Sequence, residues 1–295
     1  MSETLIAPET AAAPERAPVA AETPRRAAHV LRFDRVDRTL HGFLMLSFLG
    51  LAFSGMPVLF STTPWAGRVA RLLGGYTVIH RMHRVFATIM IVVFIVHVGR
   101  LLRRVVARKD YSVFWGPASM VPQPRDLADM VQHIRWFVGL GPRPAFDRYT
   151  YWEKFDYWAV LWGTALMGAA GLVLWFPMAA SRVLPGWLFN VALFVHGAEA
   201  TLAIVFIFAI HFFNGHLRPG KFPMDMVIFT GSVSREELRH ERAGQYQRLA
   251  ASGTLDRLEV SPPTTKEIAQ GHLIGAIGLS LGIALFILIL YATLR

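Results

Sequence analysis

Four histidines in two long apolar segments form the most chemically informative pattern in this sequence. His83 and His97 are fourteen residues apart, and His196 and His211 are fifteen residues apart. In an α-helix these spacings correspond to about 21–23 Å, and they return the second imidazole to within about 40–60° of the first. Two such helices side by side would present paired imidazoles at two depths. Neutral imidazole is a good axial ligand for iron, so the pattern predicts two stacked haems.

The segments that must position these histidines have the composition of membrane-spanning helices. The chain has 295 residues, and 54% of them are hydrophobic, more than is usual for a soluble domain of this size. An apolar helix of about 20 residues crosses a hydrocarbon core about 30 Å thick. We therefore predict an all-α integral membrane helix bundle with a four-helix haem-binding core and a fifth C-terminal transmembrane helix. The five predicted spans are 40–60, 85–102, 157–176, 187–213 and 271–294.

The basic residues predict how this bundle is oriented. Most of the 30 Lys and Arg residues precede the first span, lie between the second and third, or follow the fourth. Cytoplasmic loops of membrane proteins carry such an excess, so the N-terminus is expected in the cytoplasm. The net charge of +10 is therefore read as a topology signal and a lipid contact, with no nucleic-acid partner. The resulting division is a disordered cytoplasmic tail (1–30), the diheme bundle (31–216) with a cytoplasmic loop (103–151), a largely loop-like cytoplasmic segment (217–269) and the fifth helix (270–295).

This topology assigns each histidine a depth. His83 and His196 share the outer level, and they are the simplest outer pair. His41, His97 and His211 share the inner level, which leaves two choices: His211 with His41, or His211 with His97. The chain has no cysteine, so iron–sulfur clusters, thiolate metal sites and covalently attached haem are excluded within it.

Several alternatives accompany this interpretation. A single histidine in a span can be a hydrogen-bonded packing residue, and zinc or copper would need three or four histidines converging at one depth. Arg84, beside His83, is a candidate partner of haem propionates, or it extends to the membrane interface. His216, at the cytoplasmic rim, is either a surface residue or part of a quinone pocket.

Five segments resemble a known family in order and topology. They are DRTLHGFLMLSFLGLAFSGMP at 37–57, IHRMHR at 79–84, YWEKFDYW at 151–158, HGAEATLAIVFIFAIHFFNGH at 196–216 and TGSVSREELRHERAGQYQRL at 230–249. Together they resemble the cytochrome b (gamma) subunits of membrane-bound formate dehydrogenases and the related diheme subunits of thiosulfate reductases. The resemblance covers about residues 32–250, and the fifth span lies outside it.

This resemblance implies a ligand for each axial position. It implies that His83 and His196 ligate the outer haem and that His41 and His211 ligate the inner one, beside a menaquinone or ubiquinone pocket. His97 is absent from that family pattern, so it is a candidate inner ligand in place of His41, a ligand of a third haem, or, with His216, a quinone-site residue. The family also implies the bacterial inner membrane as the location.

Three functions are compatible with the sequence. The first is a diheme membrane cytochrome that passes electrons between a quinone and a periplasmic iron–sulfur or multihaem cytochrome c subunit of a respiratory oxidoreductase complex. The second is a self-contained oxidoreductase of the cytochrome b561 kind that passes electrons from quinol to a small acceptor. The third is a membrane anchor that binds no cofactor, so whether the chain is an enzyme stays open.

Overall fold

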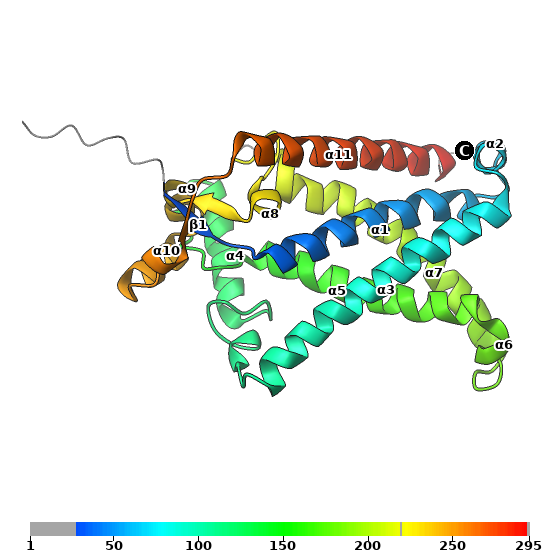
Figure 1. The fold of residues 1–295 in the computed structure, drawn as a ribbon, viewed down its shortest axis with the longest axis horizontal. Helices are drawn as coiled ribbons and strands as arrows, with labels where there is room; N and C mark the ends of the chain where they lie inside the picture. Colours follow the sequence, from blue (N-terminus) through cyan, green and yellow to red (C-terminus); the bar gives the residue numbers. More distant parts are fainter. Residues whose placement is uncertain (1–27, 219, 294–295) are drawn as a thin grey trace, which may run out of the picture.

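The computed structural model describes residues 28–218 and 220–293 of the chain. Five of its helices are long and apolar enough to cross a membrane, and they lie along the long axis of the molecule (Figure 1). They are α1 (Arg35–Leu59), α3 (Tyr76–Val106), α5 (Tyr151–Trp175), α7 (Trp187–Phe206) with its continuation to Leu217, and α11 (Thr265–Thr293). The predicted all-α membrane helix bundle, including the fifth helix, is confirmed.

The helices begin earlier than apolarity alone indicated, because polar capping residues start them. Asp34 accepts a hydrogen bond from the backbone N–H of Asp37 at 2.7 Å at the beginning of α1. At the beginning of α5, Thr150 and Glu153 form a reciprocal capping box. Such caps satisfy backbone donors that the first helical turn leaves free. Consequently α5 starts at Tyr151, and Asp156 lies inside the membrane-spanning helix instead of before it.

The long helices pack as α1 against α3 and α5 against α7, with α11 against α1 and α7. Glycines allow the fifth helix to approach closely. A Cβ atom on Gly282 would overlap the Phe208 ring, and one on Gly275 would overlap Met224. Leu285 and Ile289 then complete an apolar core with residues of α1, α7 and the short helix α2 (Pro64–Leu72).

A small folded unit, which we call the cap, covers one end of the bundle (Figure 1). Strand β1 (His29–Leu31) pairs antiparallel with both β2 (Ser232–Ser234) and β3 (Glu259–Val260). The helices α8 (Val227–Thr230), α9 (Arg235–Glu241) and α10 (Ala243–Ala251) complete the cap. Its apolar core contains Val30, Val227, Val233, Leu238, Leu249 and Leu255.

Two expectations are corrected by the cap. The predicted tail ran to residue 30, but His29 and Val30 belong to the central strand of the sheet; residues 1–27 lie outside the described part. The segment 217–269 is largely helix and strand, because Val30 supplies the middle of its apolar core from a distant part of the sequence. The loop 103–151 likewise contains a helix, α4 (Pro124–Phe137).

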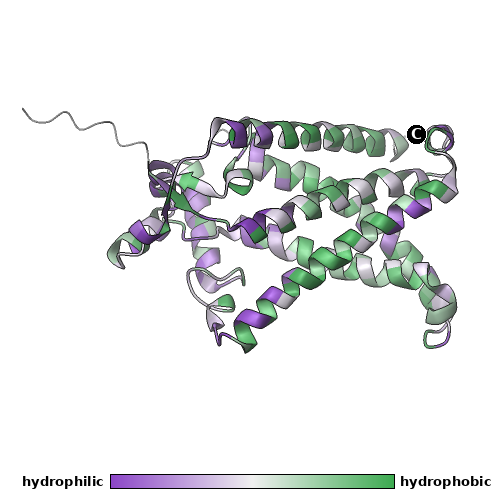
Figure 2. Cartoon of the chain, viewed as in Figure 1, coloured by the Kyte–Doolittle hydropathy of each residue, from purple (hydrophilic) through white to green (hydrophobic). Residues whose placement is uncertain are grey.

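The cap and the long helices differ in polarity. Hydrophobic residues dominate the long helices, while hydrophilic residues concentrate in the cap (Figure 2). The short helices α2 and α6 (Pro177–Ala180) lie at the opposite end, which we call the far end (Figure 1). The cap end and the far end therefore correspond to the two ends of a membrane-spanning bundle.

Candidate haem cleft

A large cleft of about 3020 Å³ runs between α1, α3, α5 and α7. All six histidines predicted from the sequence to serve as haem ligands or at a quinone site line it, together with Arg84: His41, His83, His97, His196, His211 and His216. Most of the lining is apolar, as expected for a cofactor site in a membrane bundle. In the structure, the candidate residues therefore all line the same cleft.

The far-end pair is the most regular feature of this cleft. The ring centroids of His83 on α3 and His196 on α7 lie 6.2 Å apart, with the ring planes at 70°. A metal–imidazole bond is about 2.0–2.1 Å long, and the ring centre lies about 1.1 Å beyond the nitrogen. Two imidazoles on opposite sides of one metal ion therefore have centroids about 6.2–6.4 Å apart. The observed spacing leaves room for one metal centre between the rings.

Ser54 on α1 determines which nitrogen of the His83 ring carries the proton. The Ser54 hydroxyl donates to the carbonyl of Gly50 at 2.6 Å, and it lies 3.0 Å from Nδ1 of His83. Because its single proton is engaged with Gly50, the hydroxyl accepts a hydrogen bond from Nδ1–H. The lone pair of the His83 ring is then on Nε2. Such an outer partner is typical of metal-binding histidines.

Two glycines make space beside these rings. A Cβ on Gly55 would come within 3.3 Å of Cε1 of His83, and a Cβ on Gly171 within 3.1 Å of Cε1 of His196. Nδ1 of His196 is buried. Any larger residue at either glycine would push against an imidazole.

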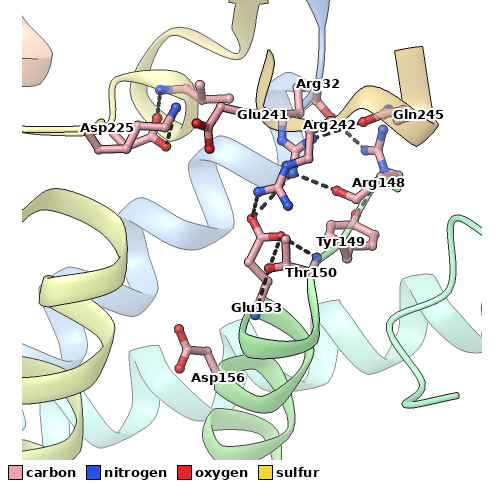
Figure 3. A network of polar contacts seen from close by, with 12 residues as sticks. Arg32, Arg148, Tyr149, Thr150, Glu153, Asp156, Asp225, Glu241, Arg242 and Gln245 are labelled. Atoms are coloured by element: carbon pink, nitrogen blue, oxygen red, sulfur yellow. Dashed lines mark hydrogen bonds and ion pairs between the residues drawn. The ribbon is translucent and has the colours of Figure 1, made fainter. Parts of the chain in front are cut away.

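At the cap end, His41 lies close enough to His211 and His216 to interact with both electrostatically. Asp156 Oδ2 lies 3.5 Å from Nδ1 of His211. The side chain of Asp156 points from α5 toward the neighbouring helix (Figure 3). His41, His211, His216 and Asp156 therefore all lie at the cap end of the cleft.

The helix that carries His211 is not a regular α-helix at that point. It continues from α7 as π-helical turns at Ile207–His211 and Phe213–Leu217. Each π-helical residue turns the chain by less than the 100° of an α-helix, since one more residue is needed to close each hydrogen bond. The fifteen-residue spacing predicted an angular offset of about 60° between His196 and His211. The π turn reduces this offset and brings His211 back toward the face of His196.

His97 has a different partner. Its Nε2 lies 2.9 Å from the hydroxyl of Tyr157 on α5, and the two rings meet edge to face at 5.7 Å. Asp37 and Arg100 are its charged neighbours. The structure therefore connects His97 to Tyr157, and it groups His41 with His211.

The remaining candidates have structural contacts of their own. The Arg84 guanidinium lies over the ring of Trp175 at 5.6 Å. Nδ1 of His216 accepts a hydrogen bond from the backbone N–H of Asp225 at 3.3 Å. Among the described residues, no three or more His, Asp or Glu side chains gather as a zinc or copper site would require.

Sequence reasoning missed three residues: Ser54, which contacts His83, and Asp156 and Tyr157, which line the cleft. Serine in an apolar helix usually bonds its own preceding turn, so nothing in the sequence distinguished Ser54. Asp156 did carry a signal, because a carboxylate inside an apolar span is costly unless it has a purpose. The predicted span 157–176 begins one residue after Asp156 and therefore does not include it.

A long apolar cleft with facing histidines on two membrane helices defines a class of protein, the membrane-embedded cytochromes. A family model described as prokaryotic cytochrome b561 matches residues 32–217 of the chain. The protein therefore belongs to the prokaryotic cytochrome b561 family. A comparison with curated proteins found no match.

Membership of this family has consequences for cofactor and location. The protein is a bacterial multi-pass membrane cytochrome of the b type, and the family implies that it binds b-type haem and takes part in electron transfer. The match includes α1, α3, α5 and α7 and leaves out the strands and helices of the cap as well as α11. The wider resemblance to membrane b-type cytochromes is confirmed at this level.

Proposed function

We propose that the protein is a diheme cytochrome that carries electrons across the bacterial inner membrane between a quinone at the cap end and a redox partner at the far end. His83 and His196 are assigned as the axial ligands of the far-end haem. The 6.2 Å spacing of their rings is the observation that carries this proposal. The free Nε2 of His83 and the small residues Gly55 and Gly171 support it.

The second haem is assigned to His41 and His211 at the cap end. The two histidines lie within electrostatic range of each other, which supports this pair, and the bond between His97 and Tyr157 disfavours His97 as the ligand. His97 and His216 then remain as residues of a quinone site beside this haem. Arg84 is proposed to lie near the propionates of the far-end haem, since it lines the same part of the cleft.

When bound, each haem supplies one-electron chemistry, and the protein controls it through ligands, burial and neighbouring charge. The chain holds the imidazoles in place, excludes water through an apolar cleft, and provides proton-exchanging side chains at the cap end. The excess of Lys and Arg at that end supports a cytoplasmic cap and N-terminus. Menaquinone or ubiquinone would thus react on the cytoplasmic side.

The redox partner at the far end is proposed to be a periplasmic iron–sulfur subunit or a multihaem cytochrome c, in a respiratory complex like those of formate dehydrogenase or thiosulfate reductase. A second candidate is a self-contained quinol oxidoreductase that acts on a small acceptor, and the family match supports it equally. Turnover of the purified chain with quinol and ferric iron or superoxide would favour this second candidate. Turnover only in the presence of a partner subunit would favour the first.

The ligand assignment is tested by counting haems. We expect two b-type haems per chain in the purified protein, and one in both His83→Ala and His196→Ala. His272→Ala is the matched control, since His272 is an exposed histidine at the start of α11. The measurements are a reduced-minus-oxidised spectrum and haem quantification per chain. Retention of both haems in either cleft variant would overturn the pair.

A further inference from the structure

Three arginines gather at the cap end of the cleft, around one carboxylate (Figure 3). Arg32 comes from the chain just after β1, Arg148 from the loop before α5, and Arg242 from the residue that begins α10. Glu153 of α5 pairs with Arg242 at 2.7 Å and with Arg32 at 3.5 Å. Arg32 and Arg242 thus share one carboxylate, and the Arg148 guanidinium has no ion-pair partner in the described part of the chain.

The charges of this cluster are buried. The exposed fractions of Arg32 and Arg242 are 8% and 7%. Burial, and next the positive charge of Arg242, lower the pKa of Arg32 to about 10, although Glu153 acts in the opposite direction. Arg148 lowers that pKa further. The cluster therefore carries positive charge that its own residues leave uncompensated.

Most hydrogen bonds of the cluster go to neutral groups. Arg32 Nη1 donates to Gln245 Oε1 at 3.3 Å, and its Nη2 donates to the carbonyl of Arg148 at 2.8 Å. Arg148 returns a bond from its Nη2 to the carbonyl of Arg32 at 2.7 Å, and its Nε donates to the hydroxyl of Tyr149 at 3.1 Å. These bonds hold the guanidinium groups in position without neutralising them.

Arg242 has a donor to spare. Its Nη2 bonds Glu153, but its Nη1 is buried and has no hydrogen-bond partner in the described residues. Arg32, Arg148 and Arg242 all line the cleft. Buried charged donors are normally paired. A positively charged cluster with an unused donor at a cavity wall has the features of an anion site.

We propose that Arg242, supported by Arg32 and Arg148, binds a carboxylate or phosphate oxyanion at the cap end of the cleft. A guanidinium group is suited to this role, because its planar fork matches both oxyanions with two parallel hydrogen bonds. Neither the family match nor the histidine pattern assigns a role to these residues. Two sources of the oxyanion are chemically equivalent here.

The first source is a propionate of the haem assigned to His211, and this source rests on the proposed function. Glu153 lies three residues, or about 4.5 Å along the helix, before Asp156, which contacts His211. The second source is a phosphate group, either of a phospholipid at the membrane surface or free in solution. The experiment separates the two.

The test compares the wild-type protein with Arg242→Gln and Arg242→Lys. Arg235→Gln is the matched control, because Arg235 is also an arginine of the cap but pairs with Asp256 and Glu259. Three measurements are made: a potentiometric titration of the haem absorbance, native mass spectrometry for bound phosphatidylglycerol, and thermal stability with and without inorganic phosphate.

If the oxyanion is a propionate, Arg242→Gln lowers the midpoint potential of one haem, since losing a positive charge favours the oxidised form. If it is a phosphate, the variant loses bound phosphatidylglycerol or the stabilisation by inorganic phosphate. For each of these measurements, Arg242→Lys is expected to give a value between those of Arg242→Gln and the wild type. Lysine keeps the positive charge but lacks the forked guanidinium group. If the Arg242→Gln variant does not fold or accumulate, the comparison of Arg242→Lys with the wild type still tests the proposal.

The proposal is overturned if the Arg242 variants match Arg235→Gln in all three measurements, which would make the cluster a structural ion network only. Failure of the proposed function is recognised separately. A wild-type protein without haem would remove the first measurement and the haem assignment together. The two phosphate measurements would still decide whether the arginines bind an anion.

Discussion

Asp156 Oδ2 lies 3.5 Å from Nδ1 of His211, and the two residues come from facing membrane helices. The other carboxylate oxygen of Asp156 is buried without a hydrogen-bond partner in the described residues. A carboxylate beside the distal nitrogen of a metal-binding histidine orients the ring and increases its basicity. If His211 ligates the cap-end haem, Asp156 is a positioning residue for it.

Replacing the Asp156 carboxylate is expected to change the midpoint potential of one haem only. In Asp156→Asn the His211 ring loses a negative neighbour, so the midpoint potential of the cap-end haem rises while that of the far-end haem stays constant. A potentiometric titration with spectral resolution of both haems checks this result. Asp129→Asn in α4 serves as the control, and equal shifts in both haems would argue against a local effect of Asp156.

Ser54 offers a second test at the far end. Ser54→Ala removes the acceptor for Nδ1–H of His83, and outer partners of this kind contribute about 10–100-fold to metal affinity. We expect faster loss of one haem during purification, measured as haem per chain. Ser47→Ala is the matched control, since Ser47 bonds the carbonyl of Phe43 on the same helix at 2.7 Å. Equal haem retention in both variants would contradict a role for Ser54.

The choice between His41 and His97 is decided by a pair of substitutions. We expect His41→Gln to lose the cap-end haem, and His97→Gln to keep two haems but to raise the KM for quinol. The reason is that His97 is bonded to Tyr157, whereas His41 is within electrostatic range of His211. Haem content and quinol kinetics are the measurements. Loss of a haem in His97→Gln alone would reverse the assignment.

The cap should lose stability in acid because of Glu241. Burial alone would raise the pKa of Glu241, but Arg218 and Arg143 outweigh it and lower the pKa to about 2. The folded-state pKa thus lies below the unfolded value of about 4.3. The stabilisation is complete above that value and disappears as the pH falls toward 2.

Hydrogen exchange of cap amides between pH 6 and pH 3 measures this effect. Glu241→Gln is expected to destabilise the cap by about 1.5–3 kcal/mol near neutral pH and to show a flatter pH dependence. Glu236→Gln, at an exposed position of α9, should behave as the wild type does. An unchanged acid dependence in Glu241→Gln would contradict the assigned pKa shift.

The sequence by itself determined the five spans and the depth of each histidine. Apolar length and helical spacing are local quantities, so they are readable without a structure. The far-end pair His83 and His196 follows from the same reasoning, because both residues lie toward the outer side of segments that are predicted to run inward. The basic residues predicted the polar end of the molecule in the same way.

Only the tertiary structure decided which side chains contact each histidine. The bond of His97 to Tyr157, the acceptor Ser54 and the approach of Asp156 to His211 join residues from different helices. The cap depends on β1, which pairs with strands more than 200 residues away in the chain. The π turn at His211 changes a helical angle that regular spacing cannot reveal. Contacts between distant segments depend on packing, and packing is a property of the whole fold.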